Sequence, residues 1–517
     1  MKLTAHAFKV SISEPTAAIT RDDSLVMGVG PNDHIRISLN GSVVSSVIIT
    51  DELVKKGEIY LPTLIMEKCG AYEGDVVDVE YCPLPESIRS IRKKIHGGKL
   101  NKEEIGSVIN DIMDGVLSER EILAFVSAFN VHNADLTEIA YLTRAMAATG
   151  KTVDLGVRPV FDFHSLGGVP GNKVTPIVVS IVASQGLPIP KLSSRAISSA
   201  CGTSDFVDTF CDVEMDSESL KNAVRTAGGV FACGNEDYAP VGNIIIKAER
   251  PMGIDPRPVM IASIMSKKIA LGTTHLLMDL PMGEGAKIPD MEAAEDFAGD
   301  MISLGTILGV HVECAVSDAG KPIGRAIGPI LEARECIEVL EGRGDPSVAA
   351  KACAMAGIIL EMAGENDGES KAREILSSGK ALKKFREIVK AQNGDPAIEP
   401  SDLIPGEFVK EVHARFDGYV QYLDNRSIVA VAKAAGAPSD TGAGIMLDHK
   451  AGDLVKKGDV LFRIFAENQS KLDRAIESAR SRRPMKVDPE PVSIPERGPI
   501  TARFPSKEML DLIRFRS

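Results

Sequence analysis

The stretch that begins near residue 157 repeats one order of elements, and this order limits the possible folds more than any other feature. A strand-like run, RPVFDF, leads into a glycine-rich loop and then into TPIVVSIVASQG, an apolar run with the length of a helix. A second strand-like run follows in PIPKLSS. Alternation of strand, loop and helix is typical of α/β domains. We therefore predict a large α/β domain with a mixed or mainly parallel sheet over residues 156–405.

The pattern changes on both sides of this domain, which predicts a multidomain α/β protein. Alternating apolar residues and an Asn-Gly turn signal indicate a small β-barrel-like module over residues 1–85. Helical periodicity indicates a helical subdomain over residues 86–155, joined by residues 243–272. Short strands with glycine at the turns indicate a C-terminal β-rich, hammerhead-like module over residues 406–517. Its end, from about residue 480, is rich in Arg, Pro and Lys and is expected to be a loosely held tail.

Composition limits which ligands the protein is expected to bind and in which cellular compartment it is expected to work. The net charge is −13 and the chain has no Trp, which argues against nucleic acid as a partner. A small phosphorylated ligand remains compatible, because a local pocket can be positive on an acidic protein. The eight cysteines show no CxxC spacing, and no apolar run reaches the length of a signal peptide core or a membrane span. We expect a cytoplasmic protein without structural metal, disulfides or a membrane partner.

The first glycine loop of the α/β domain, DFHSLGGVPGNKVT, has the features of an anion-binding loop. Its glycines allow close approach of the backbone, and the helix that follows offers free N–H groups. Ser165 and Thr175 add hydroxyl donors, and Lys173 adds charge nearby. The pattern is neither GxGxxG nor GxxxxGK[ST], so a dinucleotide or a nucleoside triphosphate is not favoured. Taken alone, a tight turn without a ligand explains this loop equally well.

A second loop after the next strand strengthens the case for an anion site. The stretch KLSSRAISSACGTSDFVDTF places five hydroxyl side chains around Arg195. Carboxyl ends of successive parallel strands meet at one edge of a sheet, where ligands bind in such folds. Two hydroxyl-rich loops at this edge predict two phosphate groups, or one phosphate and a sugar.

Two further stretches carry polar groups that fit the same interpretation. IDPRPVMIASIMSKK holds Asp255, and it places Ser263 and Lys267 on one helix face, while Lys268 is expected to point into solvent. MDLPMGEGAKIPD holds Lys287 at the end of a glycine-rich turn. Each stretch alone is better explained as a surface turn or an exposed helix face, so their value lies in their number.

Four motifs together resemble the thymidine/pyrimidine-nucleoside phosphorylase family: DFHSLGGVPGNK, SSRAISSACGTSD, IDPRPVMIASIMSKK and SDAGKPIGRAIGPILEARE. They are most similar to its archaeal branch, which acts on AMP. The resemblance implies that inorganic phosphate, as co-substrate, attacks C1′ of AMP, and of CMP and UMP as further candidates. The base leaves and ribose 1,5-bisphosphate forms, without metal or cofactor. The resemblance also implies a homodimer through the helical subdomain, or a larger homo-oligomer.

The resemblance assigns roles to individual positions. Asp255 is expected to donate a proton to the departing base, and His164 and Lys267 are expected near the base. The hydroxyls expected to bind inorganic phosphate are those of Ser165, Thr175, Ser193 and Thr203. The positions expected to contact the nucleotide are Gly168, Ser194, Arg195, Ala196, Ile197, Ser198, Ser199, Thr203, Ser263 and Lys287.

At two positions this chain differs from the thymidine phosphorylases, and both differences help to choose among the candidate functions. The thymidine enzymes carry a lysine where this chain has Phe163, and an arginine where it has Ala248. Both departures favour the nucleotide branch over a thymidine phosphorylase, and Lys173 is a candidate for the missing charge. A non-catalytic nucleotide sensor is disfavoured because Asp255 and the hydroxyl loops are present. A carrier protein, suggested by the C-terminal hairpins, lacks the lysine of a carrier hairpin.

Overall fold

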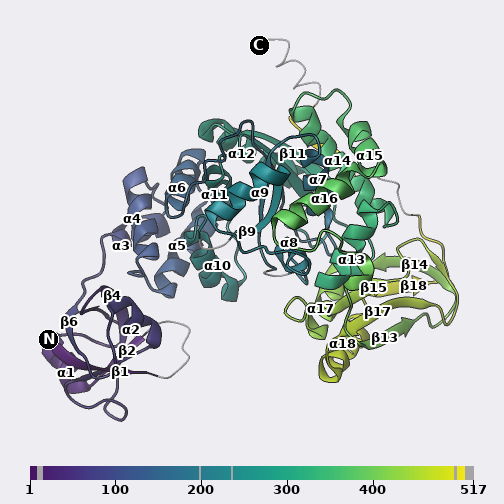
Figure 1. The fold of residues 1–517 in the computed structure, drawn as a ribbon. Coiled ribbons are helices and arrows are strands. Elements are labelled where there is room, and N and C mark those ends of the chain that lie inside the picture. The colour runs from purple at the N-terminus through teal and green to yellow at the C-terminus, as the bar shows by residue number, and fades with distance from the viewer. Residues whose placement is uncertain (9–15, 197–198, 235–236, 494–497, 507–517) are drawn as a thin grey trace. The chain divides into compact units, whose positions relative to one another are not determined.

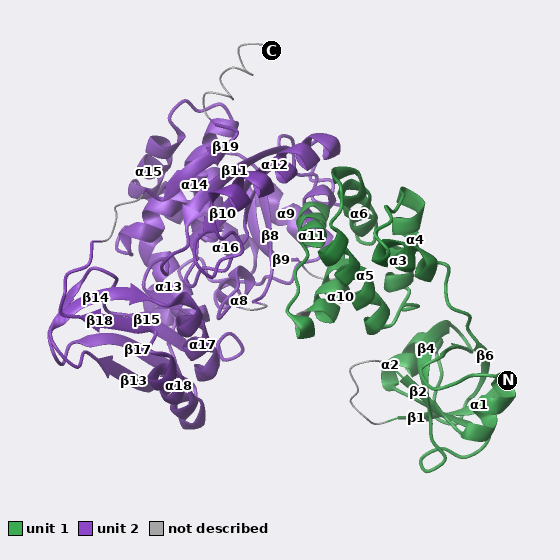
Figure 2. Ribbon diagram, turned by 180° about the vertical axis from the view of Figure 1, so that it is seen from behind, with its two compact units in different colours: residues 1–151, 238–266 green, residues 152–237, 267–517 purple. Residues whose placement is uncertain are grey.

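The computed structural model describes residues 1–8, 16–196, 199–234, 237–493 and 498–506 (Figure 1). The chain divides into two compact units, which Figure 2 shows in different colours. Unit 1 comprises residues 1–151 and 238–266, and unit 2 comprises residues 152–237 and 267–517. Within the described ranges, no helix has both the length and the apolarity needed to cross a membrane.

Unit 1 begins with a closed β-barrel, which confirms the predicted N-terminal barrel-like module. Strand order around the barrel is β1-β5-β2-β4-β3-β6, and alternate residues of each strand fill its interior. The Asn40-Gly41 turn joins β3 to β4 as an antiparallel hairpin, as the sequence indicates. The strands are β1 Lys2–Ala7, β2 Thr16–Ile19, β3 His34–Ser38, β4 Ser42–Ile49, β5 Glu58–Leu61 and β6 Val76–Tyr81, with helices α1 Arg21–Met27 and α2 Thr63–Cys69 between them.

The rest of unit 1 is helical, which confirms the predicted helical subdomain. Ser118 and Glu121 form a capping box at the start of α5, and Asn101 and Glu104 form another before α4. Helix α10 packs against α5 and α4, so a later segment of the chain joins this bundle. The helices are α3 Ser87–Ile95, α4 Lys102–Met113, α5 Glu119–His132, α6 Leu136–Ala148, α10 Val241–Glu249, the 3₁₀ turn η1 Arg250–Met252 and α11 Arg257–Ala270, which continues into unit 2 after Ser266.

Unit 2 contains the predicted α/β domain. Its four-stranded sheet has the order β19-β11-β10-β7, in which β7, β10 and β11 are parallel and β19 is antiparallel. A second, parallel pair consists of β8 and β9, and the N–H of Phe161 donates to the carbonyl of Pro188 at 2.9 Å, which sets the start of β7 beside the start of β8. The strands are β7 Phe161–Ser165, β8 Ile189–Ser193, β9 Gly229–Cys233, β10 His275–Met282, β11 His311–Asp318 and β19 Ile500–Phe504.

Apolar helices enclose this sheet. Every residue of α7 is buried, which is why its sequence shows no polar face. Helix α14 packs against α7 and α15, and together with α16 they form one large hydrophobic core with the inner faces of the strands. The helices are α7 Val174–Ala183, α8 Thr203–Val207, α9 Ser217–Ala227, α12 Met291–Leu308, α13 Pro329–Leu340, α14 Pro346–Met362, α15 Gly368–Ser377 and α16 Lys380–Ala391.

The C-terminal module is β-rich, as predicted, and is tied to the α/β domain within unit 2. Its larger sheet has the order β12-β15-β17-β13, and its smaller sheet has the order β16-β14-β18. Strand β12 precedes the whole module in sequence, so the α/β domain contributes an edge strand to it. The elements are β12 Ala326–Ile327, β13 Phe408–His413, β14 Gly418–Leu423, α17 Asn425–Ala435, β15 Gly444–Leu447, β16 Leu454–Val455, β17 Val460–Ala466, α18 Gln469–Arg482 and β18 Met485–Asp488.

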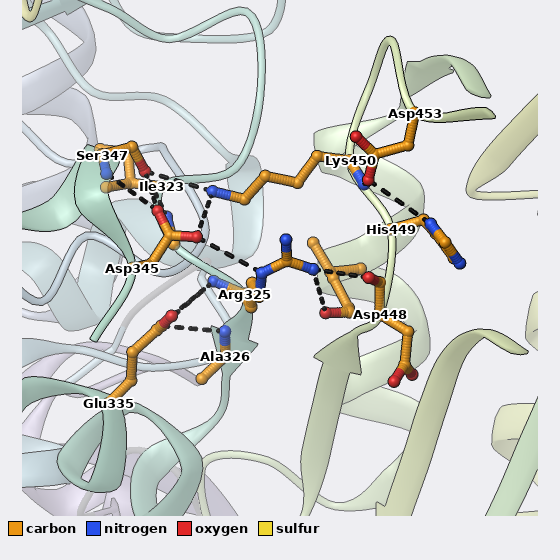
Figure 3. A network of polar contacts seen from close by, with 12 residues as sticks. Ile323, Arg325, Ala326, Glu335, Asp345, Ser347, Asp448, His449, Lys450 and Asp453 are labelled. Atoms are coloured by element: carbon orange, nitrogen blue, oxygen red, sulfur yellow. Dashed lines mark hydrogen bonds and ion pairs between the residues drawn. The ribbon is translucent and has the colours of Figure 1, made fainter. Parts of the chain in front are cut away.

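A polar network holds the two parts of unit 2 together (Figure 3). The guanidinium of Arg325 donates to the carbonyl of Asp448 at 2.6 Å and lies 3.5 Å from the carboxylate of Asp345. Lys450 reaches the same carboxylate at 2.7 Å from the C-terminal module. Asp345 is largely buried, and such a carboxylate is stable in its charged form only when paired.

The prediction that the chain from about residue 480 is a loosely held tail is wrong for two segments. Strand β18 pairs with β14, and β19 adds to the edge of the α/β sheet beside β11. Arg503 in β19 forms ion pairs with the buried Glu313 at 2.7 Å and with Glu361 at 2.5 Å. The charged composition suggested solvation, but here the charge neutralises carboxylates that lie up to 190 residues away in the chain.

Candidate active site

Strand β7 ends in a group of basic side chains. Burial lowers the pKa of His164 well below its usual range, and the positive charges of four lysines lower it further. The imidazole is therefore neutral near pH 7. We call the following residues the basic cluster: His164 on β7, Lys191 on β8, Lys267 and Lys268 on α11, and Lys287 in the loop after β10.

Three buried polar atoms at this cluster lack a hydrogen-bond partner among the described residues. They are Nδ1 of His164, the hydroxyl oxygen of Ser193, and Oδ1 of Asp162, whose other carboxylate oxygen pairs with Lys268. Buried polar atoms are nearly always paired, so an unpaired donor in a basic environment marks a place for a ligand or a water molecule. The surplus of positive charge favours an anion.

The two lysines at the end of α11 have different environments. Lys268 is buried and forms an ion pair with Asp162 at 2.7 Å, so the prediction that it points into solvent is wrong. The reason is that this end of the helix is buried in unit 2, where a lysine is usually paired with a carboxylate. Lys267 is partly buried, and its side chain lies beside Gly234, where a Cβ atom would be 3.5 Å from its Cε. Gly234 in turn donates its N–H to the carbonyl of Ser193 at 2.7 Å.

Ser165 is fixed by a buried network that the sequence did not reveal. Its hydroxyl donates to the carboxylate of Asp279 at 2.7 Å and accepts from the side-chain amide of Asn172 at 3.0 Å. Asp279 also accepts from Ser317 at 2.5 Å and forms an ion pair with Lys351 at 2.8 Å. A signal did exist, because Lys351 is a lone lysine in the apolar run of α14, and such a lysine is seldom buried without a partner.

The first loop also contains Thr175 and Lys173. Thr175 is the buried second residue of α7, in the first turn where N–H groups have no helical partner. Lys173 is fully buried, and its ammonium donates to the carbonyls of Ile323 and Ala326 and pairs with Glu335. The proposal that Lys173 supplies the charge missing at Phe163 is therefore wrong, because its charge is already neutralised.

The second loop folds into a closed turn. The carboxylate of Asp205 accepts from the N–H of Ala196 at 2.7 Å and from the N–H of Gly202 at 2.8 Å. A Cβ atom at Gly202 would lie 2.6 Å from the nitrogen of Ala196 and 2.7 Å from the carbonyl oxygen of Ser194. Only glycine fits there, and the turn leads directly into Thr203, the first residue of α8.

The remaining predicted residues of this loop differ in their surroundings. Arg195 is exposed and already pairs with Asp208 at 2.9 Å and with Glu214 at 3.1 Å. Ser199 donates its hydroxyl to the carbonyl of Cys201 at 3.0 Å, and Ser194 is exposed. Ile197 and Ser198 lie outside the described residues.

The structure brings two predicted nucleotide-contact positions together. Gly168 has a φ of +88°, which favours glycine. A Cβ atom at this position would lie 3.8 Å from Cα of Ala286 and 3.9 Å from the nitrogen of Lys287. The first glycine loop and the loop after β10 are therefore neighbours, although they are far apart in sequence.

Asp255 and Ser263 belong to unit 1, whereas the two loops and the basic cluster belong to unit 2. Asp255 lies between η1 and α11 and is exposed. Ser263 lies on α11, with its hydroxyl oxygen 3.2 Å from the place that a Cβ atom of Gly242 would take. In the described part of the chain, no group of three or more His, Cys, Asp or Glu side chains is placed to hold a metal ion, and the eight cysteines are free thiols.

Family models match the chain in the order of its modules. Residues 88–150 match the helical bundle domain of the glycosyl transferase family, and residues 157–382 match its a/b domain. Residues 419–486 match the C-terminal domain of pyrimidine nucleoside phosphorylases. The crystal structure of an anthranilate phosphoribosyltransferase from Thermus thermophilus has the same fold over 59% of this chain and 99% of its own, with a TM-score of 0.51 and 18% identity. The fold and the family models thus define a glycosyl transferase.

Curated relatives match nearly the whole length of the chain. The AMP phosphorylase of Pyrococcus furiosus is 44% identical over 475 residues, which are 91% of this chain and 94% of the relative. That of Thermococcus kodakarensis is 44% identical over 478 residues, 92% of this chain and 95% of the relative. That of Pyrococcus abyssi is 46% identical over 464 residues, 89% of this chain and 92% of the relative. The chain belongs to the AMP phosphorylase family.

Proposed function

We propose that this protein cleaves AMP with inorganic phosphate and releases adenine and ribose 1,5-bisphosphate. An oxygen of the phosphate forms a bond to C1′ while the bond from C1′ to N9 of adenine breaks. A proton is delivered to the leaving base, and no redox change occurs. CMP and UMP are further candidate substrates, since only the base differs.

The observation that carries this proposal is the basic cluster with its unpaired hydroxyl at the ends of β7 and β8. Phosphorolysis has to bring two phosphate groups onto one sugar, and their repulsion must be offset by cations and donors that are already in place. Lys267 and the carbonyl of Ser193 flank Gly234, and Lys287 approaches Gly168, so cationic side chains lie along both loops. The choice of AMP rests on the near full-length relatives.

The residue roles in this proposal are those that the resemblance implies, and the described contacts agree with some of them. Ser193 and Thr175 would donate to inorganic phosphate, and Ser165 would be held in position by Asp279. Lys287 would bind the nucleotide next to Gly168. The further predicted phosphate and nucleotide positions keep the roles that the resemblance gives them.

Asp255 is proposed as the proton donor to the base, a role that rests on the resemblance of its motif. General acids of this kind contribute roughly 10²–10⁴-fold to a rate. The proposal includes a homodimer or larger homo-oligomer, which comes from the same resemblance. It also includes a cytoplasmic location, which rests on the cysteine spacing and the lack of long apolar runs, and a hammerhead-like arrangement of the C-terminal sheets, which rests on the pattern of short strands.

A thymidine phosphorylase is the second candidate, and Phe163 argues against it. This side chain is fully buried in the core of unit 2, so it offers no cation at the position where the thymidine enzymes carry one. Ala248, at the other departure, is buried in α10. A nucleotide sensor would bind AMP without turnover.

Release of free base separates these candidates. The protein is incubated with phosphate and, in turn, AMP, CMP, UMP, adenosine or thymidine, and each base is quantified by chromatography. We expect phosphate-dependent release from AMP. Release from thymidine but not from AMP would replace the proposal by the second candidate, and tight AMP binding without any release would indicate a sensor.

A further inference from the structure

Lys191 is the member of the basic cluster that the resemblance leaves without a role. It lies on β8 two residues before Ser193 and is only 4% exposed. Its ammonium donates to the carbonyl of the neighbouring Leu192, and no carboxylate in the described residues lies within ion-pair distance of it. A buried lysine without a carboxylate is rare, because burial disfavours its charge.

The surroundings of Lys191 contain more positive than negative charge. Burial and the charge of Lys268 lower the pKa of Lys191 to about 7, while Asp162 raises it and Lys267 lowers it further. Asp162 does not compensate Lys191, because it is already paired with Lys268 at 2.7 Å. The free protein thus holds a buried amine whose charge lacks a partner.

The position of this amine relates it to the anion-binding loops. The start of β8 lies beside the start of β7, and the charge of Lys191 acts on His164 at the end of β7. Ser193, with its unpaired hydroxyl, follows on the same strand. The amine, the hydroxyl and the imidazole therefore belong to one region at the ends of two neighbouring strands.

We propose that Lys191 binds the phosphate dianion that acts as the attacking group, donating to it in place of the carbonyl of Leu192. The proposal rests on the proposed function for the identity of the anion. A dianion supplies the negative charge that Lys191 lacks in the free protein, and Ser193 gives it a second donor. Lys191 would then supply the cation that Phe163 cannot.

Calorimetric titration of the full-length protein with inorganic phosphate alone, at about pH 8.5, tests this assignment. Lys191 is then mostly neutral in the free protein, and binding of the dianion restores its charge. The heat of binding, measured in two buffers of different ionisation enthalpy, gives the number of protons taken up. We expect uptake of close to one proton per phosphate bound.

Three variants make the test specific. Lys191→Met should weaken phosphate binding at least roughly tenfold and abolish the proton uptake, while the free protein stays folded because an uncompensated buried amine is removed. Lys191→Arg should keep much of the binding without uptake, since a guanidinium stays charged. Lys380→Met, which removes an exposed lysine of α16, should match the wild type in both measurements.

Each outcome decides the assignment. Unchanged phosphate affinity and unchanged proton uptake in Lys191→Met would overturn it. If Lys191→Met binds inorganic phosphate normally but binds ribose 5-phosphate more weakly, the assignment is also overturned. That result would mean that Lys191 binds the 5′-phosphate of the nucleotide instead. The wild-type protein could bind phosphate with the expected proton uptake and yet release no base from AMP. That result would support the role of Lys191 in phosphate binding and would contradict only the proposed function.

Discussion

Replacing Lys351 by Met would remove the only cation paired with Asp279 among the described residues, beneath the hydroxyl of Ser165. The two side chains are 3% and 0% exposed, and their nitrogen and oxygen lie 2.8 Å apart. Loss of one partner leaves a carboxylate uncompensated in a medium of low dielectric constant, which costs about 3–5 kcal/mol. Because two hydroxyls still donate to that carboxylate, we expect about 3 kcal/mol, the lower end of this range.

The assay has to report on unit 2, because a multidomain chain need not unfold in one step. Hydrogen exchange of the amides of β10 and α14 in dilute urea provides this report. The matched control is Arg373→Met, which breaks an exposed ion pair with Glu369 of 2.6 Å and should cost less than about 1 kcal/mol. Equal losses in the two variants would refute the reasoning that burial makes the pair of Lys351 important. A raised KM for phosphate is expected in Lys351→Met, since Asp279, the hydrogen-bond partner that positions Ser165, loses its cation.

Four further predictions test other parts of the account. Gly202→Ala should distort the second loop and weaken phosphate binding, measured by calorimetry, whereas Gly299→Ala in α12, where a Cβ atom meets nothing within 4 Å, should bind normally. Without phosphate, the free energy of unfolding should fall as the pH drops through about 6.5. His164 takes up a proton there in the unfolded chain, but stays neutral in the folded protein because its pKa is lowered. His164→Asn should flatten this slope in urea unfolding, and an unchanged slope would assign it to other groups. Arg503→Met should lose about 3 kcal/mol, the lower end of the range for a broken buried ion pair, because Glu313 and Glu361 lose their arginine while Glu313 keeps its contact with His311. The loss should be seen as faster hydrogen exchange in β11, and unaltered exchange would mean that the C-terminal strand is not an anchor. Asp255→Asn should keep AMP affinity and lose roughly 10²–10⁴-fold in turnover, and wild-type turnover would remove it from the acid role.

The parts of the fold that follow from local sequence were predictable. The strand, glycine loop and helix around Ser165 are set by neighbouring residues, and so is the capping box of Ser118. The same holds for the hairpin at the Asn-Gly pair. In each case the physical cause lies within a few positions of the element it shapes.

The parts that depend on distant partners were not predictable from pattern. The hydroxyl of Ser165 and the carboxylate of Asp279 are 114 positions apart, and Arg503 and Glu313 are 190 positions apart. Composition classed the charged C-terminal residues as solvated, because it cannot show which buried carboxylate they neutralise. For the same reason the predictions for Lys268 and Lys173 are wrong. The sequence around a lysine does not show whether the side chain is exposed or is buried against a distant carboxylate.

Lys191 illustrates the limit most clearly. In sequence it is one polar residue in a short strand, two positions before Ser193 in a hydroxyl-rich loop. Its significance comes from what surrounds it: a buried place, a carboxylate that already has another partner, and an unpaired hydroxyl nearby. These surroundings come from residues that are distant in sequence, so they can be seen only in the folded structure.

The most direct test of the central claim follows the fate of the phosphate. The protein is incubated with AMP and ¹⁸O-labelled inorganic phosphate, and the products are examined by ³¹P NMR and mass spectrometry. Phosphorolysis predicts equal amounts of adenine and ribose 1,5-bisphosphate, with the label in the phosphate on C1 and not in that on C5. Adenine released together with unlabelled ribose 5-phosphate would mean hydrolysis, and would contradict the account.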